Sequence, residues 1–156
     1  MSGSSTRTGT DGWTAARFSV SLIDAQSIAS SRGIGERFSF ERPSCGLSHV
    51  GLGVARAVEA RGAGRFSDCA KQARELFASL RIVGDAAPDA AGPLLLGGFG
   101  FDDEPGTAAH WSAFPPARLV LPDLLVSRIG ENAWVTAVDR PDERESDRTF
   151  VRRMRE

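Results

Sequence analysis

The residue types that most often carry out chemistry are few and scattered in this sequence. The two histidines, His49 and His110, lie far apart and form neither an HxxxH nor an HExxH arrangement. The two cysteines, Cys45 and Cys69, match no metal or redox spacing, and no serine stands in a GxSxG turn. We therefore expect packing or surface roles for the histidines and free thiols for the cysteines. No catalytic residue is assigned to this chain.

Three further patterns resemble ligand sites only in part. Gly51-Leu52-Gly53 begins like a dinucleotide fingerprint, but Arg56 stands where the third glycine belongs, so tight strand packing is the better explanation. Asp102-Asp103-Glu104 precede a Pro-Gly turn, where adjacent carboxylates cannot all face one cation, which favours a solvated turn. Lys71, the only lysine, falls on the polar face of an expected helix and is no candidate base. No metal-binding or substrate-binding residue is assigned either.

Composition and charge narrow the class of protein. The chain has 156 residues, of which 41% are hydrophobic, and a formal net charge of -1. This charge gives no electrostatic reason to expect nucleic acid or a membrane as a partner. The first residues lack the apolar stretch of a signal peptide, and the longest apolar runs are too short to span a bilayer. We expect a cytoplasmic protein.

The elements that would position these residues are mostly β-strands. Residues 1–16 are small and polar, which predicts a flexible N-terminal segment. From Phe18 to Leu22 large apolar residues alternate with serines, a pattern typical of a half-buried strand. Further strands are expected at 37–41, within 46–60, at 93–101 (a buried strand), at 118–128 (one edge or bulged strand broken by Pro122) and at 133–138.

One long amphipathic helix interrupts the strands. Apolar residues recur at three and four positions from Phe66 to Leu80. Ser67 is the expected N-cap, and Asp68 suits the positive end of the helix dipole. No β-α-β alternation is visible, so the sequence predicts an α+β fold with a largely antiparallel sheet.

The segment 139–156 differs from the domain at 17–138 because most of its residues are charged. Its large apolar residues are Phe150, Val151 and Met154. We interpret the segment as a solvated charged tail. The alternative is the start of a truncated helix whose packing partners are missing.

The order of several motifs resembles the amino-terminal portion of isochorismate synthases, within the family of chorismate-using enzymes. Those enzymes share a GGF-F-D strand, a W--F turn, an LVLP-type strand, a later W-V-T strand and an upstream F-W-ERP segment. The tryptophan-pocket motif LLES of related anthranilate and aminodeoxychorismate synthases is absent here. The matching residues are Phe38 to Ser44, Leu96 to Asp102, Trp111, Phe114-Pro115, Leu119 to Pro122 and Trp134-Val135-Thr136.

The resemblance implies part of a larger chorismate-binding-enzyme fold. In that family a lysine acts as general base and a glutamate as general acid in converting chorismate to isochorismate, a precursor for menaquinone or siderophores. Mg²⁺ held by glutamates binds the substrate carboxylate, which neutralises its charge. The family's motif places all of these residues downstream of the W-V-T strand, so none is carried over. Lys71 does not match the catalytic lysine, and the acidic residues from Asp102 to Glu104 do not match the metal ligands.

Two hypotheses follow for the function. In the first, the chain is an amino-terminal fragment of an isochorismate synthase, inactive alone and completed by a carboxyl-terminal catalytic half. In the second, it is a non-catalytic α+β interaction module that pairs with a separate catalytic half. The family resemblance favours the first.

Overall fold

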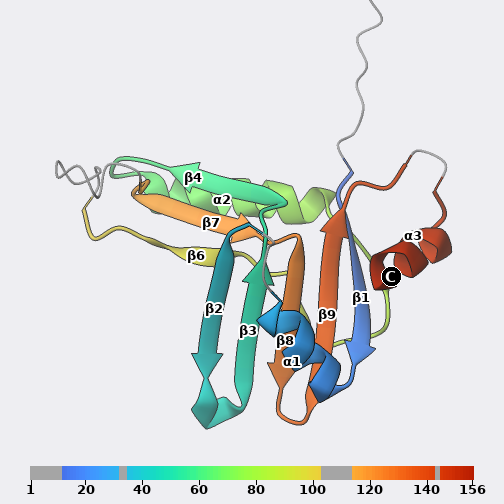
Figure 1. The fold of residues 1–156 in the computed structure, drawn as a ribbon. Coiled ribbons are helices and arrows are strands. Elements are labelled where there is room, and N and C mark those ends of the chain that lie inside the picture. Colours follow the sequence, from blue (N-terminus) through green and yellow to red (C-terminus); the bar gives the residue numbers. More distant parts are fainter. Residues whose placement is uncertain (1–11, 32–34, 103–113, 143–144) are drawn as a thin grey trace, which may run out of the picture.

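Two β-sheets of unequal size form the frame of the molecule, and their strands run crosswise to each other (Figure 1). The computed structural model describes residues 12–31, 35–102, 114–142 and 145–156. Within these residues it has three α-helices and nine strands. The fold is α+β with largely antiparallel pairing, as the sequence predicts.

The larger sheet contains six strands, and all neighbours pair antiparallel except one. The exception is the first strand and its outer neighbour, which run parallel. A parallel pair requires a long crossover, and here this crossover includes strands of both sheets. The strand order is β2 (Arg37–Arg42), β3 (Leu47–Leu52), β8 (Leu124–Ile129), β9 (Asn132–Asp139), β1 (Thr14–Val20) and β5 (Arg81–Gly84).

The smaller sheet has three antiparallel strands and one helix on its face. Their order is β4 (Arg56–Ala60), β7 (Ala117–Leu121) and β6 (Leu96–Phe99), and α2 (Arg65–Ser79) lies over β4 and β7 (Figure 1). This helix confirms the prediction for residues 66–80. It packs Cys69 and Leu76 against an apolar cluster of Val58, Ala117 and Leu121.

Two details of α2 differ from the prediction. The N-cap position is Gly64, so Ser67 already lies in the first turn, where its hydroxyl donates to the Gly64 carbonyl at 2.7 Å. Phe66 and Phe77 belong to the predicted apolar stripe but are exposed. The helix therefore buries a narrower face than its periodicity indicates.

The predicted strand at 118–128 is two strands in different sheets, which corrects the sequence-based interpretation. Pro122 is fully buried at the corner between β7 and β8. Because proline has no backbone N–H, it cannot continue a hydrogen-bonded ladder. The corner is held by two other backbone bonds, from Ala55 N to Leu121 O at 2.9 Å and from Val138 N to Asp123 O at 2.8 Å.

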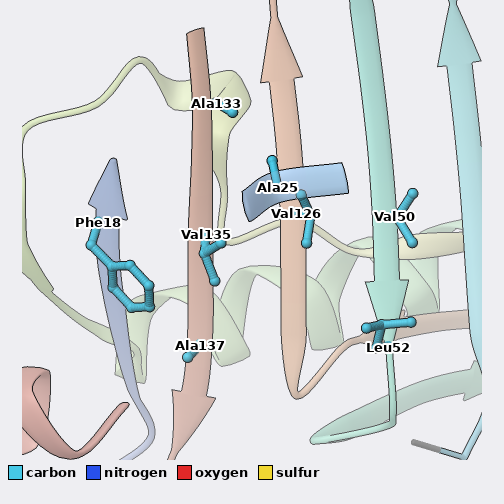
Figure 2. Packing of buried hydrophobic residues seen from close by; sticks show 8 residues of the cluster. All are labelled: Phe18, Ala25, Val50, Leu52, Val126, Ala133, Val135 and Ala137. Atoms are coloured by element: carbon cyan, nitrogen blue, oxygen red, sulfur yellow. The ribbon is translucent and has the colours of Figure 1, made fainter. Parts of the chain in front are cut away.

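A short helix, α1 (Leu22–Ser30), covers the larger sheet and was not predicted. The Ser21 hydroxyl accepts a hydrogen bond from Asp24 N at 3.1 Å and caps the helix. Leu22, predicted to end a strand, is instead the first helical residue. Figure 2 shows Ala25 of α1 lying over the apolar side chains of the sheet, and the cluster comprises Phe18, Ala25, Val50, Leu52, Val126, Ala133, Val135 and Ala137.

Both predicted chain-end segments need correction where they are described. β1 begins at Thr14, and Ala15 and Ala16 are completely buried, so the boundary of the N-terminal segment at residue 16 was set too late. Within 139–156, residues 147–155 form α3 (Asp147–Arg155), so the helix of the second alternative is present, but it does not lack packing partners. Phe150 of α3 is 0% exposed, and the helix packs on β5 and β1.

Strand β6 lies at the edge of the smaller sheet, whereas the sequence predicts a buried strand at 93–101. Only Leu96 is partly buried, and the remaining three residues of β6 are exposed. The chain approaches β6 from a 3-10 turn, η2 (Asp89–Ala91), that packs on β8 and β9. The apolar run Leu94-Leu95-Leu96 is only half-buried, and Leu95 packs against the edge of the cluster under α2.

Candidate functional site

A groove crosses the face of the larger sheet that is opposite α1. Val50 and Leu52 of β3 point into the cluster under α1, so the alternate residue His49 points to the other face. Phe40 of β2 is the direct partner of His49 in the ladder. The groove has a volume of about 600 Å³ and is lined by Arg37 to Phe40, His49 and Leu94 to Gly97.

The His49 imidazole is fixed by a chain of buried hydrogen bonds. His49 is only 4% exposed, and its Nδ1 lies 2.9 Å from the Ser127 hydroxyl. Ser127 Oγ donates its single proton to the Ala91 carbonyl at 3.3 Å, so it accepts from Nδ1–H of His49. Burial lowers the pKa of His49, which agrees with a neutral ring. The uncharged imidazole of His49 therefore forms part of the wall of the groove.

The same chain of hydrogen bonds anchors η2. Thr136 Oγ1 donates to the Ala91 carbonyl at 3.0 Å, so two hydroxyls from adjacent strands bind one oxygen. Both hydroxyl residues are 0% exposed. The sequence indicated Thr136 only as part of the Trp134-Val135-Thr136 motif and did not indicate Ser127, although a lone polar residue inside an apolar strand was the available signal. Their role is to hold the segment that forms the second wall of the groove.

The glycines of the apparent dinucleotide fingerprint are explained by close packing, as predicted. A Cβ on Gly51 would lie 2.8 Å from Leu96 Cδ1, and one on Gly53 would lie 2.0 Å from Asp123 Oδ2. Gly53 also has a φ of +72°, which favours glycine. Asp123 Oδ2 accepts a hydrogen bond from Val54 N at 2.9 Å, and burial raises the pKa of this carboxyl.

The other singled-out residues do not converge. Lys71 is exposed on α2, and Asp102 is exposed beyond β6. Cys45 is exposed and Cys69 is buried, both with free thiols, and burial raises the pKa of Cys69. Asp103, Glu104 and His110 lie outside the described residues. Across the ranges that the structure describes, none of these side chains forms a nucleophile-base pair.

The donor set needed for the family's metal is also lacking in the described part of the chain. No three His, Cys, Asp or Glu side chains of the described residues come close enough together to hold a metal ion. The described residues therefore do not fit Mg²⁺. In the same residues, no helix has the length and apolar character needed to cross a membrane.

A second, smaller hollow lies between α2 and β4. Its volume is about 330 Å³, and its lining is mainly polar. The guanidinium of Arg140 lies 4.4 Å from the centre of the Trp13 ring at its rim, an arrangement that holds an arginine side chain in place. The lining includes Arg56, Gln72, Glu75 and Ser79.

Comparison with known proteins gives one family and one fold. A profile described as chorismate binding enzyme matches residues 6–156. No curated protein matches the chain. Among solved structures, MenF, the menaquinone-specific isochorismate synthase from Escherichia coli, matches with a TM-score of 0.52 and 16% identity. That match covers 90% of this chain and 27% of the MenF chain, so the chain spans about a quarter of that structure.

The fold matches part of a larger structure. Because the family profile covers nearly the whole sequence, the chain belongs to the chorismate binding enzyme family.

Proposed function

We propose that this chain is the amino-terminal scaffold of an isochorismate synthase, an isomerase that converts chorismate to isochorismate. The observation that carries the proposal is the family match over residues 6–156. The likeness in fold to a quarter of an isochorismate synthase structure supports it. The motifs from Phe38 to Thr136 favour this member of the family over those with an LLES motif.

In this proposal the chain is inactive alone. The general base, the general acid and the Mg²⁺ ligands of the family stand on a carboxyl-terminal catalytic part, which is the partner of this chain. Mg²⁺ would neutralise the substrate carboxylate when it is bound there. The contribution of the present residues is to hold the two sheets and the groove wall in a fixed arrangement, in a cytoplasmic protein.

An activity measurement on two preparations tests the proposal. We expect the purified chain to leave chorismate unchanged in the presence of Mg²⁺. The same chain, co-expressed with the polypeptide encoded downstream of the Glu156 codon, should convert chorismate to isochorismate. The proposal fails if the purified chain alone turns over chorismate, or if the combined preparation yields anthranilate or aminodeoxychorismate instead.

The two well-formed apolar clusters favour the second candidate, an interaction module that folds without its partner. One cluster lies under α1 and the other under α2, and every member of each is buried. A module of this kind should show a single cooperative unfolding peak by calorimetry as a monomer. A broad transition without a heat-capacity peak would count against it and favour a fragment that needs its catalytic half to fold.

A further inference from the structure

The described residues include four strands at sheet edges, and these strands differ in how they are protected against pairing with another strand. Natural edge strands avoid unwanted pairing through charged side chains or a covering element. Three of these edge strands carry charged side chains, and α3 also covers β5. The charged residues are Arg37, Glu41 and Arg42 on β2, Arg56 and Glu59 on β4, and Arg81 on β5. β6 has the sequence Leu-Gly-Gly-Phe and carries no charge. It is the edge with the least protection against strand pairing.

Exposed aromatic rings lie beside this edge. Phe99 of β6 is 42% exposed, Phe66 of α2 is 53% exposed, and their ring centres are 4.7 Å apart. Phe101, two residues beyond Phe99, is 100% exposed. An apolar patch of this kind marks an interaction surface.

A buried arginine holds the patch in place. Arg65 is 5% exposed, and its Nη2 donates to the carbonyl oxygens of Gly100 and Phe101, each at 3.3 Å. Its guanidinium also lies 4.5 Å from the centre of the Phe66 ring. The start of α2 and the end of β6 are therefore tied together, so a partner meets a preformed surface and loses less conformational entropy on binding.

The two faces of β6 each offer a contact to an added strand. Leu96 lies on the face of the groove, whereas Phe99 lies on the face of α2, as expected from their different places in the alternation along the strand. Between them Gly97 and Gly98 are exposed, and a Cβ on Gly98 would meet nothing within 4 Å. An incoming strand could approach closely here and direct alternate side chains to the groove and to the Phe66–Phe99 pair.

We propose that the open edge of β6, together with Phe66, Phe99 and Phe101, is the docking surface for the carboxyl-terminal catalytic part, which adds a strand to the smaller sheet (Figure 1). This inference rests on the proposed function. The extent of the fold match indicates which partner binds this surface, because this chain corresponds to only 27% of the MenF chain. The remainder of such a fold must pack on this part, and β6 is the uncharged edge with an apolar surround.

Binding and hydrogen exchange with matched variants test the surface. The probe is the polypeptide encoded downstream of the Glu156 codon, co-expressed with the full chain and with variants Phe99→Asp and Phe101→Asp. Ile23→Asp is the control, since Ile23 is an equally apolar residue, 81% exposed, on the distant helix α1. We expect a one-to-one complex in which amide exchange at Leu96 to Phe99 slows at least tenfold. Phe99→Asp should weaken the complex tenfold or more, and Ile23→Asp should leave it unchanged.

The outcomes separate the surface from the proposed function. Protection on β2, β4 or β5 in a complex that makes isochorismate would overturn the surface and leave the function standing. Protection on β6 in a complex that makes another chorismate product would support the surface and overturn the function. Absence of a complex, or β6 pairing with a second copy of this chain, would overturn the surface. Circular dichroism and thermal midpoints of the three variants, which all alter exposed residues, verify that each remains folded.

Discussion

Arg118 and Glu36 are joined by two parallel hydrogen bonds across the junction of the two sheets. Arg118 Nη1 donates to Glu36 Oε2 at 2.7 Å, and Nη2 donates to Oε1 at 2.8 Å. Arg118 lies on β7, whereas Glu36 directly precedes β2. The hydrogen bonds with Glu36 raise the pKa of Arg118. Because this two-pronged geometry fixes direction as well as distance, the pair orients the sheets relative to each other.

Replacing the Arg118 guanidinium with a lysine ammonium should weaken the connection between the two sheets. Arg118→Lys keeps the charge but loses the paired geometry, so we expect the free energy of unfolding to fall by about 1 kcal/mol. The expected loss is modest because the Glu36 side chain is 51% exposed. Urea denaturation measures it, and Arg152→Lys on the exposed face of α3 is the control. An equal loss in both variants would refute the special role of the pair.

Two neighbouring glycines of β6 should respond in opposite ways to alanine. Gly97 has a φ of +154°, and a Cβ there would lie 2.1 Å from the Arg118 carbonyl oxygen, whereas a Cβ on Gly98 meets nothing within 4 Å. We expect Gly97→Ala to lower the free energy of unfolding by about 1–3 kcal/mol, and Gly98→Ala to leave it unchanged or raise it by about 0.5 kcal/mol. Thermal unfolding compares the two variants directly. Equal midpoints would contradict this account of the strand.

Local patterns predicted the existence of most strands but not their partners. The alternation in 37–41 and in 133–138 identified β2 and β9, and the periodicity after Phe66 identified α2. Pro122 was noticed as an interruption, yet only long-range pairing decides that the chain changes sheets there. The groove also depends on long-range contacts that local patterns do not predict. Its two walls are far apart in the sequence and are brought together by the hydrogen bonds to the Ala91 carbonyl.

One helix, α1, was not predicted, and another, α3, was given only as the alternative to a solvated tail. At α1 the serine-apolar alternation continued through Leu22 and obscured the capping signal of Ser21 followed three residues later by Asp24. At α3 the density of charge outweighed the spacing of Phe150 and Met154, which are four residues apart on one face.

The burial of Phe150 predicts that α3 is an integral part of the domain. Phe150→Ala removes a completely buried ring, which should lower the free energy of unfolding by about 3 kcal/mol or more. Chemical denaturation measures this loss, and hydrogen exchange of the α3 amides shows whether the helix detaches first. Arg148→Ala, an exposed neighbour on the same helix, should change stability by less than about 0.5 kcal/mol. Rapid exchange throughout α3 in the unaltered chain would disprove its packing.

The neutral state of His49 predicts a dependence of stability on pH. An unfolded histidine has a pKa near about 6.5, whereas burial lowers the pKa of His49 in the folded chain. Between these two values the unfolded chain binds more protons than the folded chain, so the free energy of unfolding falls as the pH falls below about 6.5. The fall ends once the pH is below the folded pKa, because both states then carry the proton.

His49→Gln isolates this effect. A glutamine amide can still donate to Ser127 but does not titrate, so the variant should lose less stability than the unaltered chain between about pH 7.5 and pH 5.5. Each unit by which burial lowers the pKa contributes up to about 1.4 kcal/mol to the difference. Urea denaturation of both proteins over this pH range measures it, and the carboxylates that they share cancel in the comparison. Parallel pH curves for the two proteins would mean that burial does not hold His49 neutral.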